Sequence, residues 1–342
     1  MSSLTRSTDP ALIRQRRSPR ARAAALIALA VLAVSACSST DEDTSQSAQF
    51  SYTDSRTQVI ELDRTPTRIV ASEQAAAALI PLGIKPVGVW GSSGFADSIP
   101  LNGLDLAGIE SIGQAYGDIN IEAVAALEPD VIVTGSYAGG ALGGIGAGTS
   151  ELAAKLSALA PILTVSAQTP SSQILDDYHS LAVALGAAMD SATITAERAA
   201  FDTAVANFKS AIAAKPGLTA MAVSPSDQFY IAINDEFPEL LDYQAWGLNL
   251  MSSTVARTSD SGSFAPVSWE NVGDYQPDLI LLDTRPYSTP RATLEQQRPT
   301  WQFLAAATSG NIADWTTDAT NNFASYTTQI TALTSAINRI SV

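Results

Sequence analysis

Short apolar segments alternate with helical patterns along the chain after residue 57. The short segments consist mostly of strand-forming residues and lie at 59–62, 68–71, 85–90, 131–134, 161–165, 218–223, 229–233 and 279–282. The stretches between them have helix-forming composition or spacing and lie at 73–82, 149–159, 171–185, 236–244 and 321–339. Strands that alternate with helices are typical of an α/β fold.

One helical pattern is much longer than the others. Apolar residues recur at helical spacing over 191–214, at Ile194, Phe201, Val205, Phe208 and Ile212, and Pro216-Gly217 ends the pattern. The segment lies between two groups of predicted strands. We therefore predict a long helix at 191–215 that connects two α/β lobes.

A sequence pattern from the first half of the chain returns in the second half. Asn120-Ile-Glu-Ala-Val124 is followed by Pro129-Asp130 and a run of strand-forming residues, and Ser268-Trp-Glu-Asn-Val272 is followed in the same way by Pro277-Asp278. The offset is 148 residues throughout. Each copy predicts a helix cap, a short helix, a break and a strand. Such junctions occur in any α/β chain, but the fixed register favours two lobes of similar architecture.

These patterns predict an α/β protein of two Rossmann-like lobes linked by a single long helix. The expected ranges are 57–190 for the N-terminal lobe, 191–215 for the connecting helix and 216–342 for the C-terminal lobe. Ligands bind preferentially in clefts at domain interfaces. We therefore expect a ligand cleft between the lobes.

The first 56 residues differ in composition from the rest. Six arginines within residues 1–22 precede an uncharged apolar stretch at 23–34, which is shorter than the roughly 20 residues that span a bilayer. This order is typical of a secretory signal peptide. Val34-Ser35-Ala36-Cys37 resembles the bacterial lipobox, whose cysteine is lipidated. We predict a signal peptide at 1–36 and a flexible polar tether at 37–56. A lipid on Cys37 would anchor the protein to the outer face of the cell membrane.

Charge and residue usage argue against several functions. The net charge is −15 at pH 7 and would be more negative without the arginine-rich leader, so nucleic-acid binding is not expected. His179 is the only histidine and Cys37 the only cysteine, which leaves no His/Cys set for zinc or copper. No Gly-x-Ser-x-Gly elbow accompanies His179, and Thr149 stands where a P-loop requires lysine. We predict a binding protein with no catalytic residues and no metal site of its own.

Aromatic and arginine side chains occur at the strand ends where α/β sheets bind ligands, and around the two repeats. Such side chains offer stacking surfaces and charge-assisted hydrogen bonds to a large ligand. Taken singly, each is as compatible with an ordinary core or surface role as with ligand binding. The candidate ligand-binding residues are Trp90, Tyr116, Tyr137, Tyr230, Arg257, Trp269, Arg285 and Tyr287.

A family resemblance rests on Arg68-Ile-Val with Leu82-Gly-Ile-Lys-Pro-Val-Gly-Val89, on Ile112-Gly113 with 120–133, and on 268–282. With these stretches the chain resembles the substrate-binding lipoproteins of ABC importers for iron-siderophores and vitamin B12. The resemblance implies a rigid connecting helix and an extracytoplasmic receptor that delivers a ferric siderophore to an ABC permease. The chelator would saturate the iron, so the protein would need neither a cofactor nor metal ligands.

The resemblance also implies that an acidic residue on each lobe docks on the permease. The position expected in the first lobe is Ala77 in this chain, so Glu73 is the candidate there, with Glu239 and Asp242 on the second lobe. Because Ala77 departs from the family pattern, docking on a dedicated permease stays an open question at the level of the sequence.

Two alternative functions also stay open at this level. Haem or cobalamin could occupy the cleft, with Tyr137 or Tyr230 in axial or stacking contact. An exported enzyme that processes the ligand would depend on His179.

Overall fold

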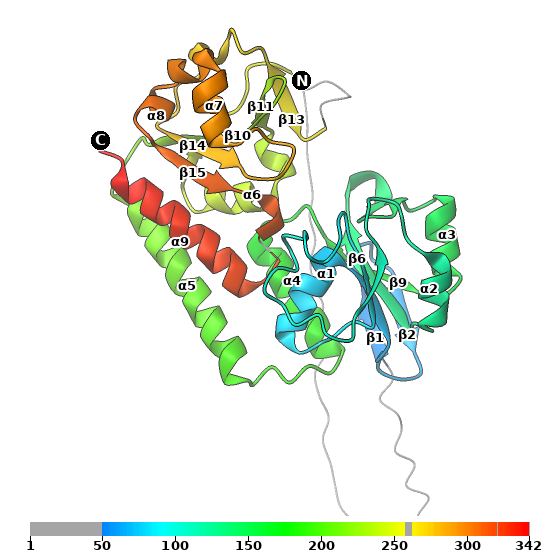
Figure 1. The fold of residues 1–342 in the computed structure, drawn as a ribbon. Coiled ribbons are helices and arrows are strands. Elements are labelled where there is room, and N and C mark those ends of the chain that lie inside the picture. Colours follow the sequence, from blue (N-terminus) through cyan, green and yellow to red (C-terminus); the bar gives the residue numbers. More distant parts are fainter. Residues whose placement is uncertain (1–49, 257–261, 320, 342) are drawn as a thin grey trace, which may run out of the picture. The chain divides into compact units, whose positions relative to one another are not determined.

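The structure, a computed structural model, describes residues 50–256, 262–319 and 321–341. The predicted signal peptide, Cys37 and Arg257 lie outside the described residues. Within the described part, no helix is both long enough and apolar enough to cross a membrane. Two α/β lobes are joined through the long helix α5 (Figure 1). We refer to residues 50–190 as lobe one and to residues 216–341 as lobe two.

Lobe one is built on a seven-stranded, largely parallel sheet. Its strands are β3 (Ile69–Ser72), β4 (Gly88–Trp90), β5 (Glu110–Gly113), β6 (Val131–Ser136), β7 (Ala141–Leu142), β8 (Gly146–Ala147) and β9 (Ile162–Ser166). Strand β6 pairs in parallel with β3 and β9, and the short β7–β8 hairpin follows it. The helices of this lobe are α1 (Glu73–Leu79), η1 (Ile80–Leu82), α2 (Ile121–Ala126), η2 (Ala138–Gly140), α3 (Glu151–Ser157) and α4 (Ser171–Ala184).

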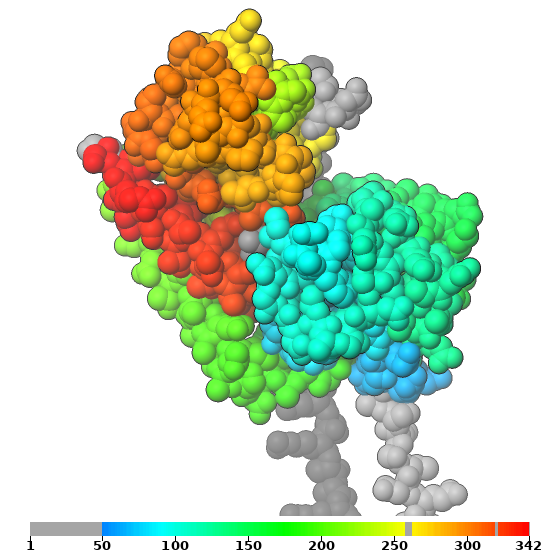
Figure 2. All heavy atoms as spheres, viewed as in Figure 1, coloured from blue at the N-terminus to red at the C-terminus, as the bar shows by residue number. Residues whose placement is uncertain are grey.

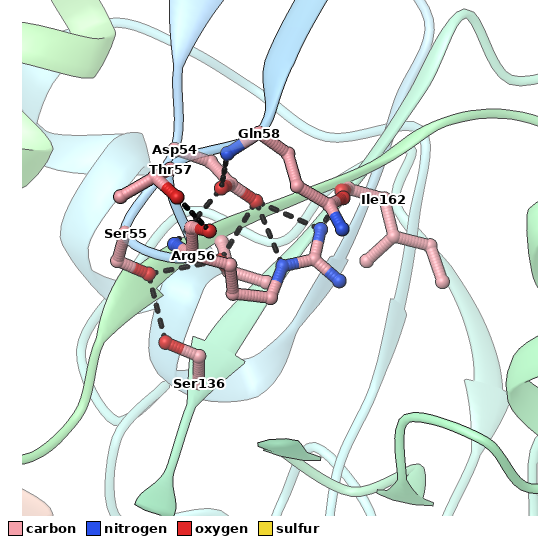
Figure 3. Close-up of polar contacts among 8 residues, drawn as sticks. Asp54, Ser55, Arg56, Thr57, Gln58, Ser136 and Ile162 are labelled. Carbon is pink, nitrogen blue, oxygen red and sulfur yellow. Dashed lines mark hydrogen bonds and ion pairs between the residues drawn. The ribbon is translucent and has the colours of Figure 1, made fainter.

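An antiparallel hairpin of β1 (Phe50–Thr53) and β2 (Val59–Leu62) packs onto lobe one. In its turn, shown in Figure 3, the Asp54 carboxylate accepts hydrogen bonds from the backbone N–H of Arg56 at 2.9 Å and of Gln58 at 3.0 Å. The hydroxyl of Ser55 lies 2.7 Å from that of Ser136 in β6. The sequence analysis placed 50–56 in the tether, whereas this segment is part of the lobe. The reason is Phe50, an apolar side chain that is buried in the core.

Lobe two is built on a six-stranded mixed sheet. Its strands are β10 (Thr219–Pro225), β11 (Phe229–Ala232), β12 (Asn249–Leu250), β13 (Phe264–Val267), β14 (Leu279–Asp283) and β15 (Ile312–Trp315). Strand β14 lies in parallel between β10 and β15, whereas β11 runs antiparallel to β10 and β13. The helices are η3 (Asn234–Glu236), α6 (Pro238–Ala245), η4 (Val272–Asp274), α7 (Arg291–Gln297), η5 (Pro299–Phe303), α8 (Ala305–Thr308), η6 (Thr317–Ala319) and α9 (Phe323–Arg339).

Both sheets are covered on both faces. In β14, Leu279 and Leu281 belong to one hydrophobic cluster and Ile280 and Leu282 to another. Successive side chains of a strand point to opposite faces, so a strand with helices on both sides needs a continuous apolar run. This requirement explains why the central strands were recognisable in the sequence as short apolar runs.

Helix α5 (Ala192–Ala213) joins the two cores. Ile194, near its start, packs in the core of lobe one, whereas Phe201 and Phe208 pack in that of lobe two. Helix α9 runs alongside α5 (Figure 1). The predicted long helix is thus confirmed. Its side chains pack in the hydrophobic cores of both lobes.

The repeated Pro-Asp pair has the same structural role in both lobes. Asp130 precedes β6, and its carboxylate accepts a hydrogen bond from the backbone N–H of Arg68, before β3, at 2.9 Å. Asp278 precedes β14, and its carboxylate accepts one from the backbone N–H of Thr219, at the start of β10, at 2.8 Å. Each aspartate therefore ties the start of one parallel strand to that of its neighbour.

The predicted fold class of two α/β lobes and a long helix is confirmed, but the second repeat does not form the predicted α-helix. Asn120 caps α2 through its side chain, as expected. The segment after Ser268 contains only the 3₁₀ helix η4. The alanines of the first copy are replaced there by Asn271 and Gly273, which are weaker helix formers.

Candidate functional site

A cavity of about 300 Å³ lies between the lobes, at the carboxyl ends of their parallel strands. In Figure 2, lobe one (blue to green) and lobe two (yellow-green to red) meet along a groove. The lining residues that the argument uses are Gln74, Tyr137 and Tyr178 from lobe one and Glu236, Phe237, Arg285 and Asp318 from lobe two. We call this space the interlobe cavity.

A second cavity of about 350 Å³ lies within lobe one. Trp90 and Tyr116 line it, and it shares Gln74, Tyr137 and Gly143 with the interlobe cavity. The two cavities are therefore neighbours, and together we call them the cleft.

The glycine-rich loop forms one wall of the cleft. The indole nitrogen of Trp90 donates a hydrogen bond to the carbonyl oxygen of Gly143 at 3.3 Å. Gly144 has φ of +70°, and a Cβ atom there would lie 2.5 Å from that same indole nitrogen. Glycine is required at this position because the backbone must approach the ring closely in a left-handed conformation.

Tyrosines are prominent on the lobe-one side. Tyr137 follows β6, lines both cavities and is 45% exposed. Tyr116 is 70% exposed at the second cavity. Exposed phenol rings at a cavity are available for stacking on a ligand. Both residues lie at the cleft, and their part in ligand binding stays a prediction.

Arg285 follows β14 and lies on the lobe-two side. Its Nε donates to Oδ1 of Asp283 at 2.9 Å and its Nη2 to Oδ2 at 3.0 Å. The guanidinium carbon lies 4.9 Å from the ring centre of Tyr287 and 5.9 Å from that of Phe237. Burial lowers the pKa of Arg285, but the hydrogen bonds and charge of Asp283 outweigh it and leave that pKa raised.

Two acidic groups of lobe two surround this arginine. Burial raises the pKa of Asp318, Arg285 lowers it in part, and Glu73 and Asp283 raise it further. Glu239 lies beneath the cavity floor, where its carboxylate accepts hydrogen bonds from the Trp315 indole at 2.8 Å and the Thr317 hydroxyl at 3.1 Å. Burial raises the pKa of Glu239 to about 7, although these hydrogen bonds and Arg285 oppose the rise.

Three other predicted ligand-binding residues are placed differently. The Trp269 indole nitrogen donates to the Ser226 carbonyl oxygen at 3.3 Å, and its ring packs on Phe229. Tyr230 packs edge-on against Phe264. Neither Trp269 nor Tyr230 lines the cavities, because their rings belong to local packing around β11 and β13. Tyr287 does not line a cavity directly and reaches the site through Arg285, while Arg257 lies outside the described residues.

The sequence analysis missed several residues that line the interlobe cavity. Asp318 follows β15, a strand that was not predicted, and Phe237 precedes α6. Tyr178 comes from α4 and is 5% exposed. Had β15 been recognised in the sequence, Asp318 would have been a candidate, because ligands of α/β sheets bind at the carboxyl ends of the strands. Tyr178 carried no such signal because its position depends on how α4 packs.

The three acidic residues predicted to dock on a permease are all buried, and their role in docking stays a prediction. Glu73 is 2% exposed and accepts hydrogen bonds from the backbone N–H and hydroxyl of Ser92 and from the hydroxyl of Ser98. Glu239 and Asp242 are 0% and 2% exposed. Carboxylates held by internal donors cannot contact a partner surface without losing those bonds.

The residues that could perform metal or triad chemistry are not brought together. Within the described residues, no group of three or more His, Cys, Asp or Glu side chains could hold a metal ion. His179 lies on α4, and its buried Nδ1 has no hydrogen-bond partner in the described part of the chain. It therefore lacks the orienting hydrogen bond that a catalytic histidine requires.

Comparisons with known proteins place the chain among binding proteins. Residues 78–319 match the family described as periplasmic binding protein. The chain is 26% identical over 272 residues to the "Probable siderophore-binding lipoprotein YfiY" of Bacillus subtilis (strain 168), a match that covers 74% of this chain and 77% of that protein.

Two solved structures share the fold. DesE, a ferric-siderophore receptor protein from Streptomyces coelicolor, is 30% identical with a TM-score of 0.76, over 85% of this chain and 98% of that one. The petrobactin-binding protein YclQ from Bacillus subtilis has a TM-score of 0.63 at 16% identity, over 85% and 99% of the two chains, and supports the fold alone. The family match spans most of both lobes, and the chain belongs to the periplasmic binding protein family.

Proposed function

We propose that the protein is an extracytoplasmic receptor that binds a ferric siderophore in the cleft. The observation that carries the proposal is the cleft itself, where Tyr137 lines the same cavity as Phe237 and Arg285 of lobe two, and Tyr116 lines the neighbouring cavity. The likeness to DesE over nearly the whole of that receptor supports it. Because the family consists of binding proteins, the chain is not an enzyme, as the sequence analysis predicted.

The chemistry of the cleft suits a metal chelate better than a bare ion. Free iron would need several carboxylate, imidazole or thiolate ligands from the protein. A hexadentate chelator supplies all of these ligands itself and presents an outer surface of apolar and carbonyl groups. Aromatic rings can stack on such a surface, and hydrogen-bond donors can reach its oxygens.

Two further parts of the proposal concern location and delivery. Cys37 carries a lipid that holds the mature protein on the outer face of the cell membrane. The bound siderophore passes to an ABC permease through exposed side chains other than Glu73, Glu239 and Asp242, which are buried.

The proposal is tested by tryptophan fluorescence on the chain beginning at residue 38. Trp90 lines the cleft and should report occupancy. Ferric hydroxamate, catecholate and citrate complexes are titrated separately, with the iron-free chelators, haem and cobalamin alongside. Saturation at one equivalent by a ferric siderophore is expected. Saturation by haem or cobalamin alone would replace the siderophore as ligand, and no response at all would overturn the proposed function.

Two matched variants test whether the siderophore binds in the cleft. Tyr137→Ala removes a ring that lines both cavities and should weaken siderophore binding about five- to ten-fold, the loss expected for one stacking contact. Phe303→Ala removes a ring of similar size that is 59% exposed and lines neither cavity. Equal effects of the two variants would place the ligand elsewhere.

A further inference from the structure

Arg285 is held by an aspartate from the end of its own strand. Asp283 is the last residue of β14, and its side chain is fully buried. It accepts hydrogen bonds from Nε of Arg285 at 2.9 Å and from Nη2 at 3.0 Å, and its Oδ1 accepts one from the backbone N–H of Arg285 at 3.1 Å. Paired bonds of this kind fix the plane and the direction of a guanidinium. The side chain of Arg285 is therefore ordered before a ligand arrives.

Three aromatic rings surround the same guanidinium. Its carbon atom lies 4.9 Å from the ring centre of Tyr287, 5.7 Å from that of Trp315 and 5.9 Å from that of Phe237. A cation and a ring attract one another at distances up to about 6 Å. Trp315 and Phe237 are buried in the core of lobe two, where they pack edge-on. Tyr287 differs because it is 59% exposed, so its ring lies over the guanidinium at the surface.

A short turn brings Tyr287 back to Arg285. The backbone N–H of Ser288 donates to the carbonyl oxygen of Arg285 at 2.9 Å and closes the turn. The N–H of Thr289 donates to the carbonyl oxygen of Pro225, at the end of β10, at 2.6 Å and ties the turn to the sheet. Tyr287 lines neither cavity, and its ring reaches the cleft through Arg285.

Part of the guanidinium remains available to a ligand. An arginine side chain has five N–H donors. Asp283 uses the one on Nε and one on Nη2, and within the described residues the other N–H groups of the guanidinium donate to no protein acceptor. Asp318 lines the same cavity and interacts with Arg285 electrostatically, but in the described part of the chain no hydrogen bond joins them. A ligand in the interlobe cavity can therefore accept hydrogen bonds from Arg285.

We propose that Asp283 and Tyr287 are positioning residues, which hold Arg285 so that its remaining N–H groups donate to an oxygen acceptor on the outer surface of the bound chelate. Ordering a long, flexible side chain on binding lowers affinity, and here the fold has ordered it in advance. The inference rests on the proposed function and adds the two residues that prepare its arginine. Tyr287 then acts on the ligand through Arg285 and not by direct contact.

Tyr287 provides the first test because its ring is exposed and can be removed without opening the core. Ferric hydroxamate, catecholate and citrate complexes are titrated by calorimetry into the chain beginning at residue 38, and the complex that binds is used for the variants. Tyr287→Ala should weaken binding about two- to ten-fold, the effect of ordering one long side chain on binding. Phe303→Ala removes a ring that is also 59% exposed and lines neither cavity, so it should leave the affinity unchanged.

Tyr287→Phe separates positioning from direct contact with the ligand. This variant keeps the ring that lies over the guanidinium and removes only the hydroxyl, so the native affinity is expected. A loss as large as that of Tyr287→Ala would show that the hydroxyl itself binds the ligand, and would overturn the role assigned to Tyr287.

A double-mutant cycle tests whether both residues act through Arg285. Asp283→Asn and Tyr287→Ala are each measured with Arg285 present and in the Arg285→Gln background. Each should weaken binding about two- to ten-fold with the arginine and less than about two-fold without it. Equal losses in both backgrounds would mean that the two residues act independently of Arg285, and the inference would fail. The Tyr287 and Phe303 single variants alter exposed residues, so they decide the inference even if a variant of the buried pair does not fold.

The possible failures are distinguishable. If the native protein binds none of the ferric complexes, the proposed function fails and this inference fails with it. If it binds one of them and Tyr287→Ala retains the native affinity, the proposed function stands and the positioning role is disproved.

Discussion

Asp242 of lobe two caps the first turn of helix α4 in lobe one. Its Oδ2 accepts a hydrogen bond from the backbone N–H of Ser172 at 2.8 Å, and its Oδ1 accepts one from the Ser172 hydroxyl at 2.6 Å. Helix α4 follows Pro170, which has no side-chain oxygen with which to cap it. The free N–H groups of a helix start need an acceptor, and here the other lobe supplies it.

This contact belongs to a larger connection at the base of the cleft. Tyr326 of α9 donates its hydroxyl to the same Asp242 carboxylate at 2.8 Å. Leu175 of α4 packs in the hydrophobic core of lobe two. Asn322 of lobe two donates to the carbonyl oxygen of Ala77 in α1 at 3.3 Å. Helix α4 is therefore held by both lobes, which sets the spacing of the cleft walls.

Asp242→Ala should lower the free energy of unfolding by about 2–4 kcal/mol, because it removes a helix cap and leaves buried donors unsatisfied. Chemical denaturation measures the change. Asp202→Ala, at an exposed position of α5, is the control and should cost less than about 0.5 kcal/mol. A loss as small as that of the control would show that the contact does not stabilise the protein.

Glu239 should make the protein less stable as the pH rises. Its pKa is raised by burial to about 7 in the folded state, so the folded protein holds this proton more tightly than the unfolded chain does. The associated stability is fully present below the unfolded pKa and is lost as the pH rises through about 7. The loss should amount to about 3 kcal/mol between pH 4 and pH 8.

Glu239→Gln tests this assignment because glutamine resembles the protonated acid and cannot ionise. Denaturation curves between pH 5 and pH 8 should be flatter for this variant than for the native protein. Glu270→Gln, at an exposed position, should retain the native pH dependence. If Glu239→Gln retains it as well, another group is responsible.

Arg285→Ala should be strongly destabilising, by about 3–5 kcal/mol, because it leaves the buried carboxylate of Asp283 without its partner. The double variant Asp283→Ala with Arg285→Ala should lose less than the sum of the two single variants. Arg291→Ala breaks a half-exposed pair within α7 and should cost no more than about 0.5 kcal/mol. Additive losses in the double variant would show that the pair is not coupled.

Cys37→Ala should abolish membrane association of the exported protein, since a lipid chain on this residue is the proposed anchor. Fractionation of cells that express the full chain measures the distribution, with Ser38→Ala as the control that should stay with the membrane. Membrane retention of the Cys37→Ala protein would disprove the anchor.

Much of the fold could be predicted because it follows from local patterns. The apolar runs of β6 and β14 identify strands covered on both faces, and the spacing from Ile194 to Ile212 identifies α5. Local patterns were insufficient for β1, a mostly polar segment that packs on the lobe because the side chain of Phe50 is buried in the core. They also suggested an α-helix after Ser268, where Asn271 and Gly273 weaken it to a 3₁₀ turn.

Residues that line the cleft were predictable where they directly follow a strong strand pattern or, like Tyr116, precede the first repeat. Tyr137 after β6 and Arg285 after β14 were found in this way and line the interlobe cavity. Asp318 follows the unpredicted β15, and Trp269 and Tyr230 were selected but pack locally. Strand ends indicate the edge of a sheet, but the direction of each side chain depends on its neighbours.

The sequence by itself determined the two α/β lobes, the long helix between them, and the absence of a histidine or cysteine set for metal binding. Only the tertiary structure decided which acidic residues are buried, that Asp283 compensates Arg285, and that Asp242 caps a helix of the other lobe. The physical reason is the separation along the chain of the residues that determine each feature. Helices and strands depend on side-chain periodicity over a few neighbouring residues, whereas burial, charge pairing and capping depend on residues that lie far apart in the chain and meet only after it folds.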